Sequence, residues 1–443
     1  MRNLHNIGSQ LNQNKKSVSM SSDVDLNQMV ADVSVEAASF EVDAMEIEAV
    51  SNSIVGLEAL AEQIEASLEG GGLDRFGAGL VTVAVESHLG QFGIKVEDAI
   101  PSLESFGGES TREQATTISV ESIKEKANDL IKWLVGKFEE VRQKIMEWYK
   151  KSFSTAASLK ASAEKLAKAA GESNGTLKDD VEKIKLGGGA KYLYLETTGK
   201  VDAGKLISGT DALKSLTRDF FQDHGAMITK MADLAEKTFK AAADAPKETW
   251  EGKDESAVYK DGKFLGAVTY KELFDALPKG DTNVFLGGKI LRMPKMAGKL
   301  DTLEDFNVAV KDLRVRFESK KTSAGKAVEV ADDQEIDALK LPDISKVADG
   351  VAEVAASIQA YETDYFKYQK SMEKAMAAAR KVGEKTDKYT LGSVGRGTNK
   401  VVASKLKLLQ DANSYPATQI TSCAIGTSKA LLDVCQKSLA QYA

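Results

Sequence analysis

The sequence contains little proline, cysteine or histidine, and each shortage excludes a class of protein. Only six of its 443 residues are proline, and because a proline inside a helix costs about 3 kcal/mol, this shortage favours long helices. The two cysteines, Cys423 and Cys435, are too few for a disulfide framework and indicate a reducing compartment. The three histidines, His5, His88 and His224, form no HExxH motif, and no CxxC motif occurs. We therefore expect no metal site.

Long apolar stretches are also missing from the sequence. The longest are short, such as LVTVAV at residues 80–85, whereas a membrane-spanning helix needs about 20 apolar residues. The first twenty residues contain no apolar run of signal-peptide length either. We therefore expect a soluble protein that is made in a cytoplasm.

Catalytic motifs are missing as well. The glycine-rich segment GSVGRGTNK at residues 392–400 lacks the Lys-Ser or Lys-Thr pair that directly follows the last glycine of a phosphate-binding loop. We interpret it as a flexible basic loop between helices. Carboxylates occur throughout the chain, so no pair of them stands out as a general acid and base. The sequence thus offers no catalytic residue and no cofactor site, and we expect a protein that is not an enzyme.

The charge changes sign along the chain. Residues 1–121, here called the acidic segment, contain six Lys/Arg and twenty Asp/Glu, a net charge of −14. Residues 122–443, here called the body, contain 53 Lys/Arg and 46 Asp/Glu, a net charge of +7. This division suggests that the body has a polyanionic partner and that the acidic segment keeps the two apart for a time. An acidic domain that merely adjoins a basic one would give the same numbers.

The acidic segment has only weak helical periodicity. Residues 23–69 are rich in Glu and Ala and end at three consecutive glycines, and residues 73–100 form a weakly apolar stretch. The following segment, up to residue 121, has no strong helical period. We therefore expect the acidic segment to consist of loosely ordered helices and loops.

A strong helix is predicted directly after the acidic segment. Ser122 and Glu125 form an S-x-x-E capping box, in which the hydroxyl and the carboxylate each satisfy a free backbone N–H group. Apolar residues then repeat at helical spacing from Ile123 to Trp148, so we expect an amphipathic helix over residues 122–152. This helix carries eight Lys/Arg against five Asp/Glu. Its apolar face either packs on its own domain or lies on a membrane surface.

The rest of the body is predicted to be mainly α-helical, with long antiparallel helices in a bundle. The longest periodic element covers residues 345–384, where apolar positions alternate steps of four and three for five heptads, as in a coiled-coil seam. We expect it to pack within the chain, against a helix over about 209–243 and a C-terminal helix over about 415–441. A further helix is expected over about 155–170. The seam consists of Val347, Val351, Val354, Ile358, Tyr361, Tyr365, Tyr368, Met372, Ala375, Ala379 and Val382.

A mixed α/β portion is expected over residues 185–300, before the long helices of 345–443. Tyr192 and Tyr194 favour a strand. A small β-hairpin insert is predicted at about 255–294, with turns at Asp261-Gly262 and Gly287-Gly288. In the preceding helix, His224 falls on the apolar face, where we expect a buried histidine with hydrogen-bond partners.

The acidic segment repeats a short pattern: a small residue, any residue, then glutamate. Seven such Ser/Ala-x-Glu tripeptides occur in its 121 residues, against five in the remaining 322. Because the segment is rich in Ser, Ala and Glu, composition explains part of this repetition. The last tripeptide, Ser119-Val120-Glu121, ends where the charge changes sign. The seven tripeptides end at Glu36, Glu41, Glu46, Glu69, Glu86, Glu104 and Glu121.

The segment SLESFGGESTREQATTISVES, followed by SIKEKANDLIKWLVGKFEEVRQKIMEWYK, resembles the internal head proteins of giant tailed bacteriophages, over roughly residues 23–152. The resemblance implies a virion protein whose N-terminal propeptide directs it into the procapsid core, among other head core and capsid proteins. It implies that a prohead protease then removes this propeptide after a small-x-Glu site. The mature protein would stay packed with the phage DNA, and in some members it enters the host with the genome.

The residue pattern and the resemblance together predict where the propeptide ends. We expect the main cut at the end of an exposed, extended segment, between Glu121 and Ser122, so that Ser122 becomes both the new N-terminus and the helix cap. The residues at this site are Ser119, Val120, Glu121 and Ser122. Secondary cuts are expected after Glu104, Glu86, Glu69 and Glu36.

The charges of the two parts suggest what the cut achieves. We expect the body to bind phage DNA without sequence preference, and the acidic segment to weaken that binding until it is removed. Two alternatives remain open. One is a membrane-active or pore-forming protein that uses the 122–152 helix and the long helical hairpin. The other is an effector that is injected to act on the host.

Overall fold

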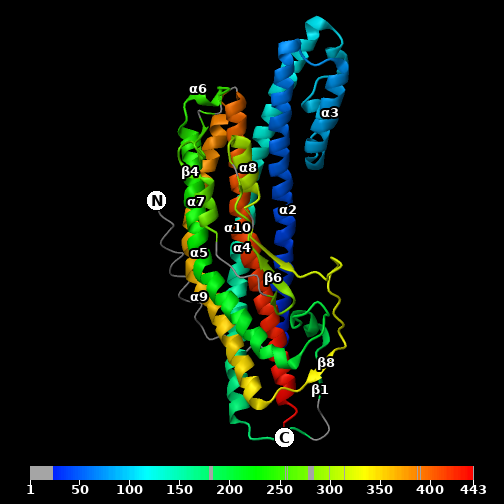
Figure 1. Cartoon of the computed structure of the whole chain (residues 1–443), viewed down its shortest axis with the longest axis vertical. Coiled ribbons are helices and arrows are strands. Elements are labelled where there is room, and N and C mark those ends of the chain that lie inside the picture. Colours follow the sequence, from blue (N-terminus) through cyan, green and yellow to red (C-terminus); the bar gives the residue numbers. More distant parts are fainter. Residues whose placement is uncertain are drawn as a thin grey trace.

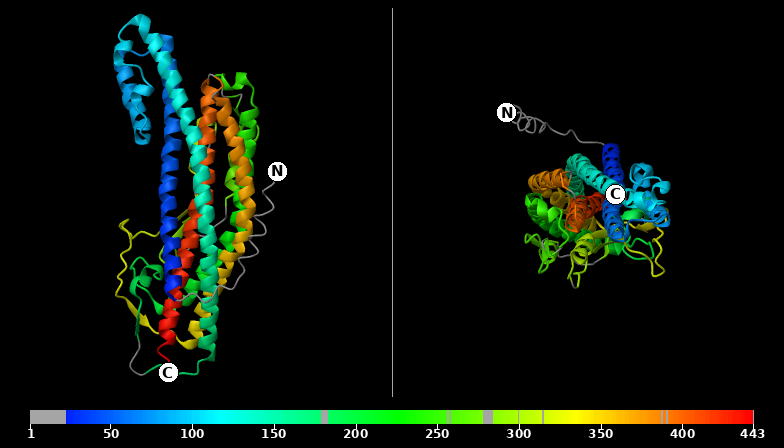
Figure 2. Two further views of the ribbon diagram at one scale, coloured as in Figure 1. Left: turned by 180° about the vertical axis from the view of Figure 1, so that it is seen from behind. Right: turned by 90° about the horizontal axis from the view of Figure 1, so that it is seen from above.

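Long helices dominate the structure, as the scarcity of proline and the heptad seam predict. They lie side by side in an elongated bundle (Figure 1, Figure 2), which confirms the expected mainly α-helical fold. The computed structural model describes residues 23–178, 183–254, 256, 258–277, 284–298, 300–313, 315–386, 388–389 and 391–442. Its long helices are α2 (Asp23–Ser67), α4 (Glu109–Glu172), α5 (Leu206–Asp244), α9 (Leu341–Thr386) and α10 (Ser393–Leu439).

Contacts between the helices show which way each one runs. α4 is antiparallel to α9, because Asn128 near its start donates a hydrogen bond to the carbonyl oxygen of Thr386 near the end of α9. α5 and α9 are instead parallel. His224 contacts Tyr361 further along both helices, and Thr210 lies against Gly350 near both starts, where a Cβ would come within 2.6 Å of its Cγ2. The antiparallel expectation therefore holds for α4 and α9 but not for α5 and α9, since the chain between these two returns along the bundle.

The heptad seam of α9 is confirmed. All of its predicted positions are buried, with at most 2% of each side chain exposed. The helix packs against α5 and α10, as predicted, and also against α4. Tyr149 of α4 lies between the seam tyrosines, with its ring centroid 4.3 Å from that of Tyr365 and 5.7 Å from that of Tyr361. An aromatic cluster thus joins α4 and α9 inside the bundle.

α10 occupies the middle of the bundle, as the view from above shows (Figure 2). It begins at Ser393, so the segment 392–400 is not the flexible basic loop that its glycines suggested. Two of those glycines permit close packing. A Cβ at Gly395 would lie 2.5 Å from the carbonyl oxygen of Trp250, and one at Gly397 would lie 2.5 Å from Leu303. Tertiary contacts therefore outweigh the low helix propensity of glycine.

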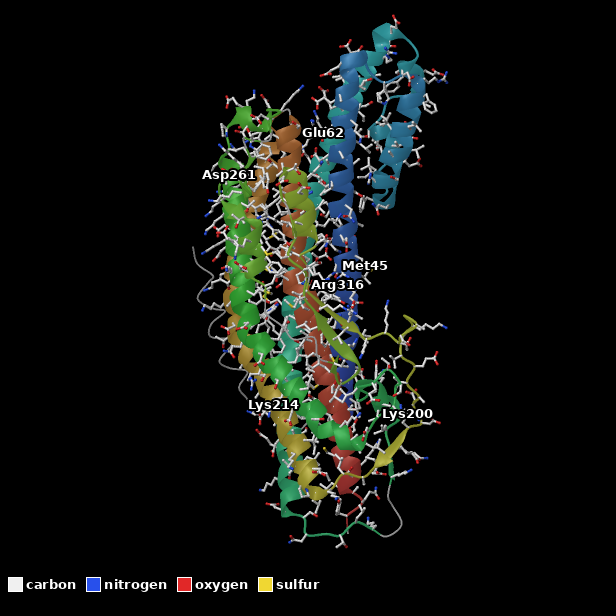
Figure 3. All side chains as sticks on the ribbon, in the orientation of Figure 1. Met45, Glu62, Lys200, Lys214, Asp261 and Arg316 are labelled. Carbon is white, nitrogen blue, oxygen red and sulfur yellow. The ribbon has the colours of Figure 1, made fainter. Side chains whose placement is uncertain are left out.

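The acidic segment is more ordered than expected. Residues 23–67 form the single helix α2, which packs along both α4 and α10. Its inward-facing apolar side chains are buried, among them Val33, Phe40, Ile47, Val50, Ile54 and Leu57. On its outward face Met45 is 69% exposed (Figure 3). The described part of the acidic segment therefore belongs to the core of the bundle, whereas residues 1–22 lie outside the described residues.

A smaller group of elements extends beyond the ends of α5, α9 and α10 (Figure 1). The turn from α2 into this group uses Gly71 and Gly72, whose φ values of 84° and 89° favour glycine. Helix α3 folds back on α2, and His88 lies so close to Gly56 that a Cβ there would come within 2.3 Å of the imidazole. The group comprises η1 (Leu68–Gly70), α3 (Arg75–Leu89), η2 (Gly90–Phe92), η3 (Val96–Asp98) and η4 (Leu103–Phe106).

The predicted β-hairpin insert is confirmed within the described residues. The turn at Asp261-Gly262 joins β2 (Tyr259–Lys260) to β3 (Lys263–Phe264), which pairs in turn with β4 (Val268–Thr269). Asp261 lies near one end of the bundle (Figure 3). The turn at Gly287-Gly288 joins β5 (Val284–Phe285) to β6 (Lys289–Arg292), and β7 (Arg316–Ser319) completes the second sheet. Three short helices accompany these sheets along the chain: α6 (Lys247–Trp250) precedes β2, α7 (Tyr270–Asp275) lies between β4 and β5, and α8 (Leu303–Lys311) lies between β6 and β7.

The strand expected at Tyr192 and Tyr194 does not form. Residues Gly187–Tyr192 are instead the 3-10 helix η5, and a second one, η6 (Ala203–Lys205), leads into α5. The three consecutive glycines before the tyrosines disfavour a strand. Among the described strands, the one nearest in sequence to these tyrosines is β1 (Lys183–Lys185). It pairs with β8 (Glu335–Asp337) in an antiparallel arrangement.

Candidate interface between the acidic segment and the body

The predicted cleavage junction lies inside a helix. α4 begins at Glu109 and continues through residues 119–122 without a break. Ser119 is fully buried, and its Oγ donates a hydrogen bond to the carbonyl oxygen of Ala115, 2.9 Å away. Val120 is buried as well, whereas Glu121 is exposed. The expected extended segment and the expected helix start at Ser122 are therefore both wrong.

Contacts with the turn after α2 explain why the helix starts early. Thr116 donates a hydrogen bond to the carbonyl oxygen of Arg112 and accepts one from the backbone N–H of Leu73, at 2.7 and 2.9 Å. Arg112 in turn donates from Nε to the carbonyl oxygen of Gly71, at 2.9 Å. Serine and threonine lower the helix propensity of this segment, but these contacts with residues about forty positions earlier in the chain stabilise its first turns.

The four secondary candidate sites are divided between helices and turns. Glu36 lies in α2 and Glu86 in α3, whereas Glu69 lies in η1 and Glu104 in η4. The side chains of Ser102, Leu103 and Glu104 are all exposed, and the backbone at Ser102 is not helical, with φ −57° and ψ 147°. Among these candidates, the bonds after Glu69 and Glu104 are the ones that lie outside α-helices, in turns that a protease can reach.

Acidic side chains of α2 pair with cations of α4. Lys137 lies between two of them, with Nζ 3.1 Å from Asp43 and 3.0 Å from Glu46. Although burial lowers the pKa of Lys137, hydrogen bonds to Glu46 and Asp43 raise it above its ordinary value. The lysine therefore stays charged at the interface. The ion pairs between α2 and α4 include Lys137 with Asp43 and Glu46, Lys144 with Asp43, Lys151 with Glu36, and Lys124 with Glu65.

A buried polar cluster lies where α2, α4 and α10 meet. Arg396 of α10 is 3% exposed and lies 2.6 Å from Glu65 of α2. One turn further along α10, Asn399 donates a hydrogen bond from Nδ2 to Glu58 Oε1, 2.8 Å away, and lies 3.3 Å from Asn128 of α4. The segment that was expected to be a flexible loop thus supplies the residues that bind the acidic helix.

Glu58 is the deepest ionisable group of this cluster. It is fully buried, and burial raises its pKa to about 7, although the hydrogen bond from Asn399 and the charge of Arg396 act against this rise. Its Oε2 has no hydrogen-bond partner among the described residues. Because the pKa lies near neutrality, Glu58 changes its charge within the physiological pH range.

The apolar face of the predicted 122–152 helix packs against the acidic segment. Trp148 is fully buried, its Nε1 donates a hydrogen bond to the carbonyl oxygen of Val33 at 2.9 Å, and its ring meets that of Phe40 edge-on at 5.8 Å. Of the two uses left open for this face, the structure shows packing within the chain. None of the described helices has the length and hydropathy that are required to cross a bilayer.

The residues that form this interface lie within a region that matches one known protein family. A model of phiKZ-like phage internal head proteins matches residues 21–437, which include α2 and all but the last six residues of the body. The chain belongs to this family. As an internal head protein it lies inside the phage head, which agrees with the resemblance seen in the sequence. No curated protein and no solved structure matches the chain.

Two further titratable groups of this internal head protein are buried away from the interface. His224 is fully buried between Tyr361, with Oη 2.6 Å from Nδ1, and the carbonyl oxygen of Ala412, 3.1 Å from Nε2, as predicted. Burial lowers its pKa to about 4. Lys405 is 1% exposed, donates a hydrogen bond to Thr238 at 2.9 Å, and has a pKa that burial lowers to about 7. Both are partnered core groups.

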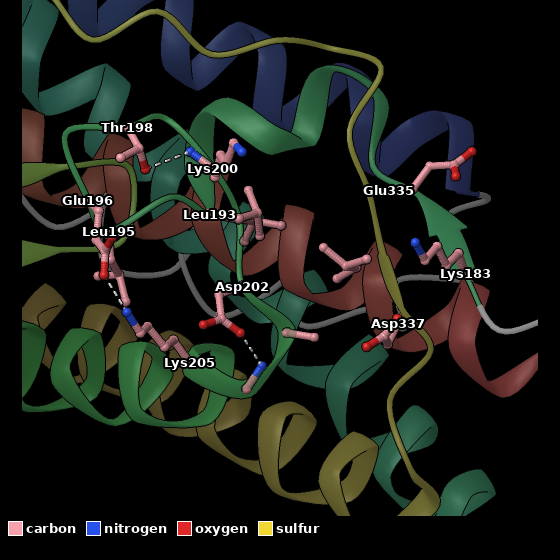
Figure 4. Close-up of a pocket in the computed structure, with 14 residues that line it drawn as sticks. Lys183, Leu193, Leu195, Glu196, Thr198, Lys200, Asp202, Lys205, Glu335 and Asp337 are labelled. Carbon is pink, nitrogen blue, oxygen red and sulfur yellow. Dashed lines mark hydrogen bonds and ion pairs between the residues drawn. The ribbon is translucent and has the colours of Figure 1, made fainter.

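An open pocket of about 490 Å³ lies beside β1 and β8 (Figure 4). It is lined by charges of both signs: Lys205 pairs with Glu196, and Asp202 accepts a hydrogen bond from the backbone N–H of Gly204 at 2.9 Å. Such mixed charges indicate no particular ligand for the internal head protein. Nor do the described residues contain a group of three or more His, Cys, Asp or Glu that could hold a metal ion. The charged lining residues are Lys183, Glu196, Lys200, Asp202, Lys205, Glu335 and Asp337.

Proposed function

We propose that this internal head protein is a structural, non-enzymatic component of the head, and that its acidic segment is a propeptide. The ion pairs between α2 and the cations of α4 and α10 carry the proposal. They neutralise side chains of the body that would otherwise attract polyanions. During assembly, the acidic segment would therefore limit contact with DNA and leave the protein free to join other head core and capsid proteins.

The proposed first cut falls between Glu104 and Ser105, carried out by the prohead protease. Ser102-Leu103-Glu104 is a small-x-Glu tripeptide with exposed side chains in a 3-10 turn. A protease needs an extended, accessible backbone, which this turn can supply at low free-energy cost. The bond between Glu121 and Ser122 would first require several turns of α4 to unwind.

A cut at Glu121 remains part of the proposal as a second step. After the first cut, residues 105–121 become the free N-terminal end of the chain that contains α4, and helix ends fray more readily than helix interiors. The tripeptide Ser119-Val120-Glu121 could then enter a protease site. The two steps together would remove the acidic segment up to the boundary where the charge changes sign.

The mature body would lie against the packaged DNA. Lysines and arginines gain free energy from the release of counterions when they contact phosphates, and this attraction needs no sequence preference. Loss of the acidic segment would expose the cations of α4 and α10 that now pair with α2, and would thereby increase the number of cations available to DNA. Delivery into the host with the genome belongs to the same proposal and rests on the resemblance alone.

Mass spectrometry of the protein from purified DNA-filled particles tests this proposal. We expect chains that begin at Ser105 or at Ser122. Particles assembled with Glu104→Ala should lack the chain that begins at Ser105. The matched control is Glu97→Ala, which changes an exposed glutamate in the neighbouring 3-10 turn that is not part of a small-x-Glu tripeptide and should leave processing unchanged. A chain that begins at Met1 in mature particles would show that the acidic segment is permanent.

A further inference from the structure

A stripe of lysines runs along the second half of α9. Successive residues of a helix are rotated by about 100°, so residues at spacings of three, four and seven share one side. The five lysines of the stripe occupy such positions and span about 27 Å along the helix axis, at 1.5 Å per residue. Four are exposed and the last is half-buried. They are Lys367, Lys370, Lys374, Lys381 and Lys385, here called the α9 stripe.

None of these lysines is neutralised by a carboxylate of the described residues. The nearby Glu373 is engaged elsewhere, since Arg142 of α4 lies 3.4 Å from it. The last lysine, Lys385, lies over the ring of Tyr389, with Nζ 5.7 Å from the ring centroid. By contrast, Lys137 at the α2 interface has two carboxylates within 3.1 Å. The stripe is therefore a row of cations that is free to contact anions from outside the chain.

The acidic helix does not lie on this side of the bundle. α2 packs along α4 and α10, whereas α9 packs against α4, α5 and α10. The stripe lies on the outer side of α9, away from its buried seam. The described part of the acidic segment thus leaves these lysines exposed in the uncleaved chain.

We infer that the α9 stripe is a docking surface for the phosphate backbone of double-stranded DNA. This inference rests on the proposed DNA association and names the surface that makes it. A row of cations about 27 Å long spans about four-fifths of one ~34 Å turn of a DNA duplex. The duplex presents a charge every ~1.7 Å along its axis. A membrane surface would also require exposed apolar side chains beside the cations. The large exposed apolar residues of the described chain all lie outside the 367–385 part of α9.

The test measures binding of the full-length chain to a 30-base-pair duplex of arbitrary sequence, by fluorescence anisotropy over a range of salt concentrations. We expect the chain to bind before any cleavage. The triple variant Lys370→Gln, Lys374→Gln and Lys381→Gln should bind about ten- to a hundredfold more weakly at low salt. It should also lose about 3 from the slope of log K against log salt, at about 0.9 per phosphate contact.

The matched control removes the same charge elsewhere. Lys320, Lys321 and Lys326 are exposed in the loop after β7, and their triple glutamine variant should bind as the unaltered chain does. Equal weakening by both triple variants would overturn the docking surface and leave only a general attraction by net charge. Binding that the α9 variant does not weaken would also overturn it, while the proposed DNA association would stand. A full-length chain that binds anionic lipid vesicles but no DNA would overturn the inference and the proposed DNA association.

Discussion

Cations on two sides of the body differ in what lies next to them. On α4 and α10, Lys137 and Arg396 face carboxylates of α2 at 3.1 Å or less. On α9, Lys370 and Lys374 face solvent without a carboxylate partner among the described residues. The acidic segment therefore neutralises the body through particular side-chain pairs on one side, and not through its net charge alone. The α4 and α10 side is also a packing interface with α2, so substitutions there should change the free energy of unfolding. Substitutions in the α9 stripe should change only the binding of DNA.

The largest effect is expected from Trp148→Ala on the covered side. Trp148 is fully buried between α2 and the tyrosine cluster, so its removal should lower the free energy of unfolding by about 3–5 kcal/mol. Chemical denaturation followed by circular dichroism measures this change. Trp133→Ala is the control, because that side chain is 38% exposed on the same helix and should cost under about 1 kcal/mol. Equal losses in the two variants would mean that α2 does not pack on α4 as described.

A smaller loss is expected when the buried arginine of the interface loses its partner. Glu65→Gln leaves Arg396 without its charged partner at 2.6 Å, and because Glu65 is partly exposed, the expected loss is about 2 kcal/mol. Glu62→Gln provides the control, since Glu62 is exposed on the same helix (Figure 3). Thermal unfolding of both variants at low salt would compare them. A stable Glu65→Gln protein would indicate that the pair contributes charge balance but no stability.

Glu58 should make the same interface sensitive to pH. Its pKa is about 7 in the folded protein and 4.5 in the unfolded chain, so the folded state binds the proton more tightly. Its contribution to stability is therefore fully present below pH 4.5 and is lost as the pH rises towards 7 and above. Compared with Glu58→Gln, the unaltered chain should lose about 2 kcal/mol more between pH 5.5 and pH 8. If the free energy of unfolding depends on pH in the same way in the two proteins, the pKa of Glu58 is not raised in the folded state.

The smallest effects are expected from single lysines on the two sides. Lys137→Gln should lower the free energy of unfolding by about 1 kcal/mol or less, because Glu46 is 44% exposed and Asp43 keeps a second cation, Lys144, at 3.6 Å. Lys374→Gln, which removes an unpaired exposed lysine, should stay within about 0.5 kcal/mol of the unaltered chain. Urea denaturation at low and high salt distinguishes the two variants, since only the stability loss of Lys137→Gln should become smaller as salt is added. A larger loss for Lys374→Gln would mean that the stripe has an internal partner.

The features that the sequence predicts well are those that depend on neighbouring residues. The heptad seam of α9 and the turn at Asp261-Gly262 follow from spacing and from local backbone preference, and both are present. The start of α10 could not be predicted in this way. Arg396 is held by Glu65, a residue 331 positions away, and no local pattern in GSVGRGTNK reveals that contact.

The sequence predicts which charged residues and tripeptides the acidic segment contains. It does not predict which of these tripeptides a protease can reach. The charge reversal indicates two oppositely charged parts, and side chains of α2 and α4 do pair with each other, although the boundary at residue 121 lies inside α4. Whether Glu121 or Glu104 is exposed to a protease depends on the turn around Gly71, which holds the first turns of α4 through Arg112. One sequence signal for the buried cluster was present and unused: Glu58 falls among apolar residues in SIVGLEALAEQ, at a position that faces the core.

The polar interior of α10 affects how the bundle responds to force. Both amide atoms of Gln410, Nδ2 of Asn413 and Oγ of Ser428 are buried without a hydrogen-bond partner among the described residues. Each such group costs about 1–3 kcal/mol relative to its hydrated state. A bundle with this interior should yield to mechanical pulling more easily than one with an apolar centre, and its long helices can unravel one after another. If the chain is delivered into the host with the genome, as proposed, such softness would ease its passage through an opening narrower than the folded bundle.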